Sequence, residues 1–287
     1  MKKLLSITVS ALILFTLKGQ TPVGSWTDHL NYNTASGISG NADVIYSSTG
    51  ASILVYEAGM NEIRKLSPVN GLSEAGIAST GWSETNSTLI IAYTSLNIDL
   101  VRGSSIDNIP DIRNRFPDGQ KKINRIRTRD NYAYLASGYG IIIADIVRKE
   151  IRDTWKPGQE SGDNEVFDLA FGNGLVYAAT ANGLWQADLQ NQGLSYPGNW
   201  LRVPGMPEVR CNLVIFAGGT LYCNVPGDAG DDIVYAISQG VSVFSQSTGT
   251  VNSSFDPAPD GFSISSSRSL RYYNSQGILK KEISSYG

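Results

Sequence analysis

The amino-acid sequence predicts an all-β fold built from repeated antiparallel sheets, and three observations support this. No long stretch of the 287 residues shows the 3.6-residue periodicity of a helix, whereas short runs of β-branched and aromatic residues are frequent. Glycine is abundant, with 30 residues, and only 17% of the chain is charged, which suits short strands joined by tight turns. The same strand–turn–strand pattern also recurs at intervals of about 43 residues.

The clearest copy of this pattern spans Asn131–Val147 (NYAYLASGYGIIIADIV). Two apolar runs, Tyr132–Ala136 and Ile141–Ile146, flank a glycine-bearing turn, which predicts a β-hairpin. Neither run alternates between apolar and polar residues, so we expect both faces of the hairpin to be covered. Further copies, the last two less regular, are expected at Val44–Tyr56, Leu89–Val101, Leu175–Leu189, Leu221–Ile237 and Phe262–Tyr273.

Two further strands accompany most of these hairpins, one after the hairpin and one before it. The strands that follow are more polar and are expected at Glu62–Leu66, Ser105–Ile109, Glu150–Trp155, Asn199–Val203 and Ile278–Ile283. Those that precede are expected at Ile77–Trp82, Ile123–Thr128, Val166–Phe171 and Cys211–Phe216. Four antiparallel strands per repeat, with the middle pair covered on both faces, are the arrangement of a β-propeller blade. The sequence therefore predicts a β-propeller of four-stranded antiparallel blades, of which about six are present.

The two ends of the chain bear on the number of blades in the ring. The chain ends just after the sixth outer strand, and Gly24–Tyr32 resembles an outer strand without partners. We therefore expect an incomplete seven-bladed ring whose remaining strands lie beyond Gly287, so that residues 20–287 are an N-terminal fragment of a longer multidomain protein. A closed six-bladed ring is the alternative.

Residues 1–19 have the layout of a secretory signal peptide. A basic start, Met1–Lys3, precedes an uncharged apolar run, Leu4–Leu17, that is too short to span a bilayer comfortably. No cysteine follows the run, which argues against a lipid anchor. We expect the protein to be exported, with no transmembrane span.

Charge and cysteine content narrow the class of protein further. Removal of residues 1–19 leaves 20 basic and 26 acidic residues, because Lys2, Lys3 and Lys18 are lost from the 23 basic residues of the whole chain. This balance does not suit a general nucleic-acid binder. Cys211 and Cys223 flank a predicted hairpin that turns at Gly218-Gly219 and are expected on opposite faces of the sheet, as buried thiols and not as a disulfide.

Catalytic and metal sites have little support in the sequence. His29 is the only histidine, so a Ser-His-Asp or Cys-His constellation would depend on it alone. No P-loop, HExxH or CxxC motif is present, and we expect no cofactor and no enzymatic activity. The acidic turn Asp228–Asp232 lacks the spacing of a calcium-binding loop and is interpreted as a solvated turn.

A basic stretch before the clearest hairpin is the candidate binding site. If Ile123–Arg129 is an innermost strand, Arg125, Arg127 and Arg129 point to one side of it. Guanidinium groups pair well with phosphates and carboxylates, so these arginines, with Lys121 and Lys122, form a candidate anionic-glycan patch. The alternative is a solvated loop whose arginines pair with Asp111, Asp118 or Asp130. Trp155, Trp185 and Trp200 are interpreted as packing residues between blades.

Three stretches resemble a known family. They are Pro22–Tyr32 (PVGSWTDHLNY), Arg64–Ser79 (RKLSPVNGLSEAGIAS) and Asn124–Trp155, in which Asn70–Ser73 and Ala136–Ile141 are the most diagnostic segments. Together they resemble the N-terminal propeller of the PorZ family of the type IX secretion system of Bacteroidetes, and the resemblance runs from Gly24 to Gly287.

The resemblance implies a non-enzymatic protein of the outer-membrane surface. Members of the family sit in the attachment complex with the sortase PorU and with PorV and PorQ, and are thought to present anionic lipopolysaccharide to the sortase. A more distant resemblance, carried by Thr180–Trp185 (TANGLW), runs to the periplasmic sensor propellers of hybrid two-component regulators. A periplasmic sensor that binds oligosaccharides is therefore the alternative function.

Overall fold

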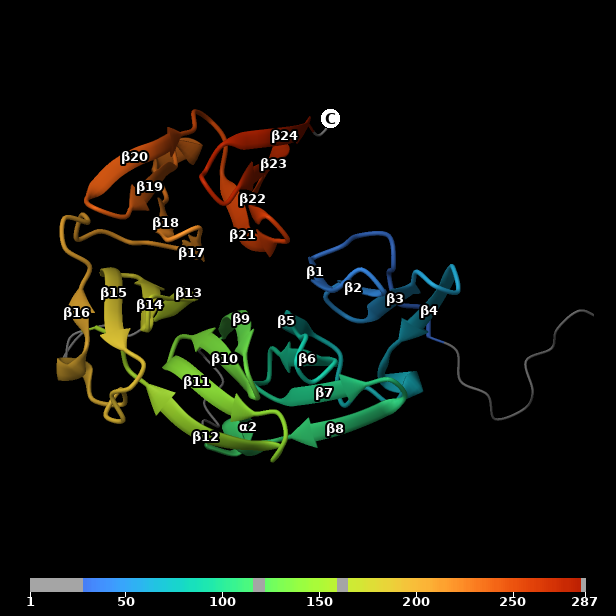
Figure 1. Ribbon diagram of the computed structural model, residues 1–287. Coiled ribbons are helices and arrows are strands. Elements are labelled where there is room, and N and C mark those ends of the chain that lie inside the picture. The colour runs from blue at the N-terminus through green and yellow to red at the C-terminus, as the bar shows by residue number, and fades with distance from the viewer. Residues whose placement is uncertain (1–27, 116–121, 159–164, 285–287) are drawn as a thin grey trace, which may run out of the picture. The chain divides into compact units, whose positions relative to one another are not determined.

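The described part of the chain consists of six four-stranded antiparallel sheets, which confirms the predicted β-propeller (Figure 1). The computed structural model describes residues 28–115, 122–158 and 165–284, and Asn31–Gly287 form one compact unit. We number the sheets as blades 1 to 6 in chain order. Blades 1 to 3 contain β1 (Gly37–Gly40), β2 (Val44–Ser48), β3 (Ile53–Glu57), β4 (Glu62–Leu66), β5 (Ile77–Ser83), β6 (Thr88–Tyr93), β7 (Ile98–Arg102), β8 (Ser105–Ile109), β9 (Ile123–Arg129), β10 (Tyr132–Ser137), β11 (Gly140–Asp145) and β12 (Glu150–Trp155). Blades 4 to 6 contain β13 (Val166–Gly172), β14 (Leu175–Thr180), β15 (Gly183–Asp188), β16 (Leu201–Arg202), β17 (Leu213–Ala217), β18 (Thr220–Val225), β19 (Ile233–Ile237), β20 (Val241–Gln246), β21 (Asn252–Ala258), β22 (Gly261–Ser266), β23 (Ser269–Asn274) and β24 (Leu279–Ser284).

Each blade is a meander in which every strand pairs with the next one in the sequence. The first strands of successive blades pack side by side, from β1 and β5 through β9, β13 and β17 to β21. The first strand is therefore the inner strand of each blade, and the fourth is the outer strand. In the described residues one α-helix, α2 (Asp111–Arg115), lies in the connection between blades 2 and 3.

The hairpin predicted at Asn131–Val147 forms β10 and β11, with Tyr134 opposite Ile143. The turn is shorter than expected, because Ser137 and Gly140 already belong to the strands. Gly140 has φ +108°, and a Cβ atom there would lie 2.2 Å from the carbonyl oxygen of Trp155. This position therefore requires glycine both for its backbone conformation and for the close approach of β12.

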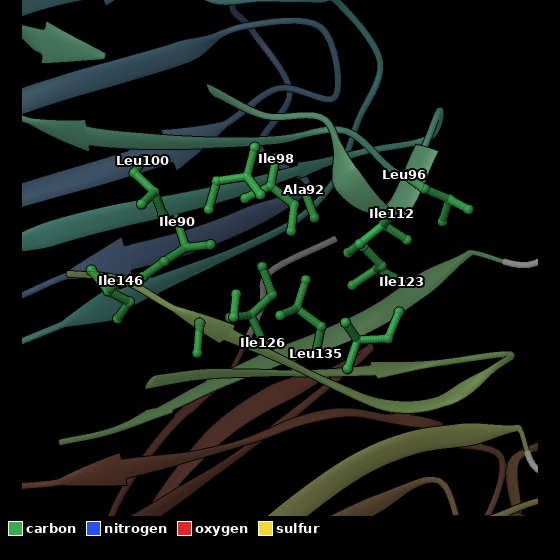
Figure 2. Close-up of a cluster of buried hydrophobic side chains, with 14 residues drawn as sticks. Ile90, Ala92, Leu96, Ile98, Leu100, Ile112, Ile123, Ile126, Leu135 and Ile146 are labelled. Carbon is green, nitrogen blue, oxygen red and sulfur yellow. The ribbon is translucent and has the colours of Figure 1, made fainter. Parts of the chain in front are cut away.

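Both faces of this hairpin are covered, as its sequence predicted. Ala133, Leu135, Ile142 and Ala144 pack against blade 2 in a buried cluster (Figure 2). The alternate residues pack against blade 4 in a second buried cluster; they are Tyr134, Ala136, Ile141 and Ile143. The apolar faces of the middle strands are thus buried between neighbouring blades.

The outer strands were predicted well where they are long. β4, β8 and β12 have the expected bounds, whereas β16 has only two residues, Leu201 and Arg202. It is shorter than the predicted Asn199–Val203 because a 3₁₀ turn (Pro197–Asn199) precedes it and Pro204 follows it closely. The described residues 28–32, part of the predicted strand Gly24–Tyr32, are in no strand, and Trp26 lies outside the described residues.

Three strands were not predicted. β1 reads GISG and β21 contains Pro257, so both lack the composition of a typical strand. β20 alternates weakly and carries an exposed apolar residue, Val243. These three strands form because each pairs with a neighbouring strand. The intrinsic strand propensity of their residues would not be enough to form them.

The segment Asn70–Ser73 joins blades 1 and 2. It begins with the last residue of a 3₁₀ turn (Pro68–Asn70), turns at Gly71 (φ 111°) and buries Leu72. Ser73 then donates two hydrogen bonds to the fully buried carboxylate of Asp99, from its backbone N–H (2.8 Å) and its hydroxyl (2.6 Å). Tyr93 and Asn108 also donate to Asp99, so this buried carboxylate is well supplied with donors.

The cysteine prediction is confirmed in part. Cys211 and Cys223 are both buried free thiols, and Cys223 lies opposite Val214 as expected. The prediction of opposite faces is wrong, because both cysteines belong to the same buried cluster between blades 4 and 5. Cys211 precedes β17, so the strand alternation does not extend to it.

Candidate functional site

The predicted basic patch lies on and beside β9, the inner strand of blade 3. Arg125, Arg127 and Arg129 are alternate residues of β9, and their side chains reach blades 4 and 6. Lys122 directly precedes the strand and is exposed, whereas Lys121 lies outside the described residues. The structure therefore places the three arginines on one face, but it gives them different surroundings.

Arg127 is held by a buried ion pair. Its guanidinium donates to both carboxylate oxygens of Asp168 on β13, at 3.0 and 2.8 Å, and its Nη2 also donates to the carbonyl oxygen of Phe255 at 2.7 Å. Asp168 is fully buried and accepts further hydrogen bonds from the backbone N–H groups of Leu169 and Val214. Arg127 thus connects blades 3, 4 and 6.

The electrostatics of Arg127 follow from these contacts. Burial would lower the pKa of its guanidinium, but the carboxylates of Asp168 and Asp256 outweigh burial and raise that pKa. With only 16% of its side chain exposed and its donors directed at Asp168 and Phe255, Arg127 has little capacity left for a ligand.

Arg125 is less tightly held than Arg127. It donates to the carbonyl oxygen of Ser253 at 3.3 Å and lies 4.0 Å from Asp256, with 23% of its side chain exposed. It lines a cavity of about 510 Å³ whose other walls are mostly serines and threonines of blades 1, 2 and 6. A second cavity of about 440 Å³, lined by both Arg125 and Arg127, lies among the inner strands.

Arg129 faces a different pocket, which we call the blade 3–4 pocket. It has a volume of about 580 Å³ and is lined by Arg129, Asp130, Tyr132, Tyr134, Ile143, Arg152, Asp153, Trp155, Leu189, Asn191 and Gln192. Arg129 lies 3.5 Å from Asp130 and 5.4 Å from the centre of the Phe171 ring. The structure thus separates Arg129 from Arg125 and Arg127.

A β-bulge in β12 shapes the blade 3–4 pocket. Ile143 pairs with Asp153 and the next residue, Ala144, pairs with Ile151, so Arg152 has no partner residue on β11. Such an extra residue redirects the neighbouring side chains, and both Arg152 and Asp153 consequently line the same pocket.

Aromatic side chains make up part of the lining of this pocket. Trp155 packs on Tyr134 with ring centres 5.5 Å apart, and its indole N–H donates to Asp153 at 3.1 Å. Burial raises the pKa of Tyr134, so this phenol stays protonated. Trp155 also packs on Trp200 with ring centres 6.5 Å apart. Its interpretation as a packing residue is therefore confirmed, but Trp155 lines the pocket as well.

Sequence reasoning missed most of the blade 3–4 pocket. In the sequence, Arg152 and Asp153 have the appearance of ordinary polar residues of an outer strand. No sequence pattern indicates the β-bulge that directs both side chains into the pocket. Asn191 and Gln192 belong to the loop after β15, which comes from another blade.

The other candidate residues are His29 and the acidic turn Asp228–Asp232. His29 is exposed. In the acidic turn, Asp232 is buried and accepts hydrogen bonds from Asn224, Gly227 and Asn252. Within the described ranges, no group of three or more His, Cys, Asp or Glu side chains is placed to hold a metal ion. None of the helices in these ranges is long and apolar enough to cross a bilayer.

Comparison with solved structures supports the fold. A structure of PorZ, a surface component of the type IX secretion system of Porphyromonas gingivalis, is similar over 91% of this chain with a TM-score of 0.77 and 18% identity. The chain spans 34% of the length of that PorZ structure. The β-propeller domain of Cps50 (Swd1) from Myceliophteria thermophila has a TM-score of 0.61 at 10% identity, covering 91% of this chain and 90% of its own. A chain of the mitotic checkpoint complex has a TM-score of 0.60 at 13% identity, covering 90% and 88%.

Comparison with protein families gives the identity of the domain. No curated protein matches the sequence. The family model of the PorZ N-terminal β-propeller domain of the type IX secretion system matches residues 45–201, which is more than half of the chain. This match covers blade 1 from β2 onward, blades 2 and 3, and most of blade 4, including the basic stretch. The chain therefore belongs to the family of PorZ N-terminal β-propeller domains of the type IX secretion system.

Proposed function

We propose that this protein is a non-enzymatic component of the type IX secretion attachment complex at the outer-membrane surface. In this role it contacts the sortase PorU and the subunits PorV and PorQ, and it binds anionic lipopolysaccharide. The observation that carries the proposal is the family match over residues 45–201. It favours this role over that of a periplasmic sensor, which the sequence left as the alternative.

Exposed cations in the matched region are compatible with an anionic glycan. Lys122 is exposed and Arg129 has 45% of its side chain exposed, so both can approach a ligand. Arg125 is less accessible, and Arg127 is occupied by Asp168. Lipopolysaccharide binding is therefore proposed to depend on the exposed members of the patch more than on Arg127.

Export is part of the proposal. Residues 1–19, which lie outside the described residues, act as the signal peptide, and residues 20–287 form the propeller domain. Protein isolated from the outer membrane should begin near Gln20 when its N-terminus is sequenced. An N-terminus at Met1 would contradict export through this signal.

We also propose that a further blade completes a seven-bladed ring. The described residues leave apolar side chains exposed on one face of blade 1, where Ile38 is 72% and Ile63 is 70% exposed. One face of blade 6 is similar, with Leu270 at 39% and Ile283 at 51%. A four-stranded sheet would bury both faces in the way that the other blades bury theirs. A structure of the natural full-length protein that leaves Ile38 and Ile283 exposed would contradict this.

Function is tested in the native cell by deleting the gene and complementing it with a tagged chain. The expected results are loss of surface-attached cargo on deletion, co-purification of the tagged chain with PorU, PorV and PorQ, and digestion of the tag by protease added to intact cells. Unchanged cargo attachment in the deletion strain would refute the proposed function.

A further inference from the structure

We propose that the blade 3–4 pocket binds an acidic sugar residue, meaning a pyranose that carries a carboxylate or a phosphate group. This inference rests on the proposed function, because it assigns a site to the glycan. It also moves the site from Arg125 and Arg127, which face the inner strands, to the opposite end of β9 and to β12.

The cation for the acidic group is Arg152. Its guanidinium lies over the ring of Tyr132, 4.9 Å from the ring centre, and donates a hydrogen bond to the Tyr132 hydroxyl. Among the described residues no carboxylate pairs with Arg152, although the side chain is exposed and lines the pocket. A guanidinium that an aromatic ring orients, and that lacks an acidic partner, can bind a carboxylate or phosphate with two parallel hydrogen bonds.

The two carboxylates of the pocket are already engaged by donors of the protein. Asp153 accepts from the backbone N–H of Thr154 at 2.7 Å and from the Trp155 indole at 3.1 Å. Asp130 lies 3.5 Å from Arg129. The pocket therefore carries two cations and two anions, of which Arg129 and Asp130 form an ion pair. Among the described residues neither Arg152 nor Asp153 has an oppositely charged partner, but Asp153 is held by two neutral donors, which leaves the guanidinium of Arg152 as the group available to an acidic ligand.

The remaining walls suit the sugar ring. Trp155 and Tyr132 provide aromatic surface, on which the apolar face of a pyranose can stack. Asn191 and Gln192, which are exposed, stand on the blade 4 side of the pocket. The Asn191 side-chain oxygen accepts from the N–H of Gly193 at 2.8 Å, and within the described ranges its amide N–H₂ has no acceptor, so it can donate to a sugar hydroxyl.

The size of the pocket also fits this class of ligand. A volume of about 580 Å³ lies within the range of roughly 300–1,000 Å³ that is common for small-molecule sites. One or two sugar rings can enter it, while the rest of a longer glycan stays in solvent.

The test is a calorimetric titration of the full chain with three probes. Trigalacturonic acid presents carboxylates, glucose 1-phosphate presents a phosphate, and maltotriose is neutral. At least one anionic probe should bind more tightly than maltotriose. The anionic probe that binds more tightly than the other shows whether the site prefers a carboxylate or a phosphate. Arg152→Gln should weaken that binding by about tenfold or more, because a charge-assisted hydrogen-bonded pair is lost. Asn191→Ala should weaken it less.

Two matched variants control for general charge effects and for folding. Arg148→Gln removes an arginine that is 75% exposed on the same blade but outside the pocket, and binding should be unchanged. Arg125→Gln removes an arginine of the inner strand and should also leave binding unchanged. Thermal unfolding of each variant shows that it is folded.

The outcomes separate this inference from the proposed function. If maltotriose binds as tightly as the anionic probes, or if Arg152→Gln binds them like the wild type, the assignment is overturned. If lipopolysaccharide binding is intact in Arg152→Gln, the proposed function stands and the assigned site is wrong. A third outcome is that the wild type binds an acidic probe but not lipopolysaccharide, and that Arg152→Gln abolishes binding of the probe. The pocket is then confirmed, and the glycan-binding part of the proposed function is refuted.

Discussion

Removing Arg127 from its ion pair with Asp168 should be among the most destabilising single substitutions in this propeller. Arg127→Met removes two hydrogen bonds to Asp168, at 3.0 and 2.8 Å, and one to the carbonyl oxygen of Phe255. Asp168 is fully buried and would keep only the two backbone donors from Leu169 and Val214. Removing one member of a buried pair costs about 3–5 kcal/mol, because the other charge is left buried without its partner.

Chemical denaturation followed by tryptophan fluorescence measures this loss as a change in the free energy of unfolding. The matched control is Arg64→Met, which breaks the partly exposed pair of Arg64 with Glu57 (3.0 Å; side chains 38% and 28% exposed) and should cost about 0–1 kcal/mol. The double variant Arg127→Met, Asp168→Asn should cost roughly 2–3 kcal/mol less than the sum of the single variants, because the pair can be lost only once. A loss below about 1 kcal/mol for Arg127→Met would refute the reasoning, because it would match an exposed pair.

Three further predictions concern single positions in the blades. Trp185→Phe should change stability by less than about 1 kcal/mol in thermal unfolding. Removal of an indole N–H that is buried without an acceptor in the described residues should offset the packing that is lost with the larger ring, and a loss of about 3 kcal/mol or more would refute this compensation. Gly81→Ala should lower the free energy of unfolding by about 1–3 kcal/mol, because its Cβ would lie 2.6 Å from Cγ2 of Ile126 in blade 3. Gly37→Ala is the control and should be tolerated, because the nearest neighbour of its Cβ would be Thr80 Oγ1 at 4.0 Å. Equal losses for the two variants would refute the packing argument. Burial, with Cys211 beside it, raises the pKa of the Cys223 thiol, so the folded protein should not react with a thiol reagent at pH 8 and should react in denaturant. The unfolded thiol has the lower pKa and therefore ionises first as the pH rises, which favours the unfolded state. The contribution of Cys223 to the stability of the fold should therefore be complete below about pH 8.5 and decrease above it.

The repeat was enough to predict the fold, because every middle strand of a propeller has the same environment. The hairpin at Asn131–Val147 is apolar on both faces since it is packed between two blades, and that property is readable from sequence. β1 and β21 were missed for the opposite reason. They are held by pairing to β2 and β22, and their glycine, serine and proline residues carry no strand signal.

The candidate site was predicted only in part. The basic stretch predicted a candidate site on β9, and the three arginines of this strand do share one face. Their partners could not be predicted, because Asp168 and Phe255 are 41 and 128 residues away in the chain. Among the described residues the expected loop pairing occurs only at Arg129, whose partner Asp130 is its neighbour in the sequence. The pocket itself depends on a bulge and on a loop of the next blade, neither of which a single sequence reveals.

The bulge at Arg152 also bears on how such a site could arise. A regular strand would need one residue fewer between Ile151 and Asp153, so the pocket-lining arginine corresponds to a single inserted codon in an outer strand. Outer strands have a free edge, which allows such an insertion without disturbing the middle strands that bury the core. A propeller can therefore gain or lose a recognition site on one blade through a change of one residue in length, while the other blades stay as they were.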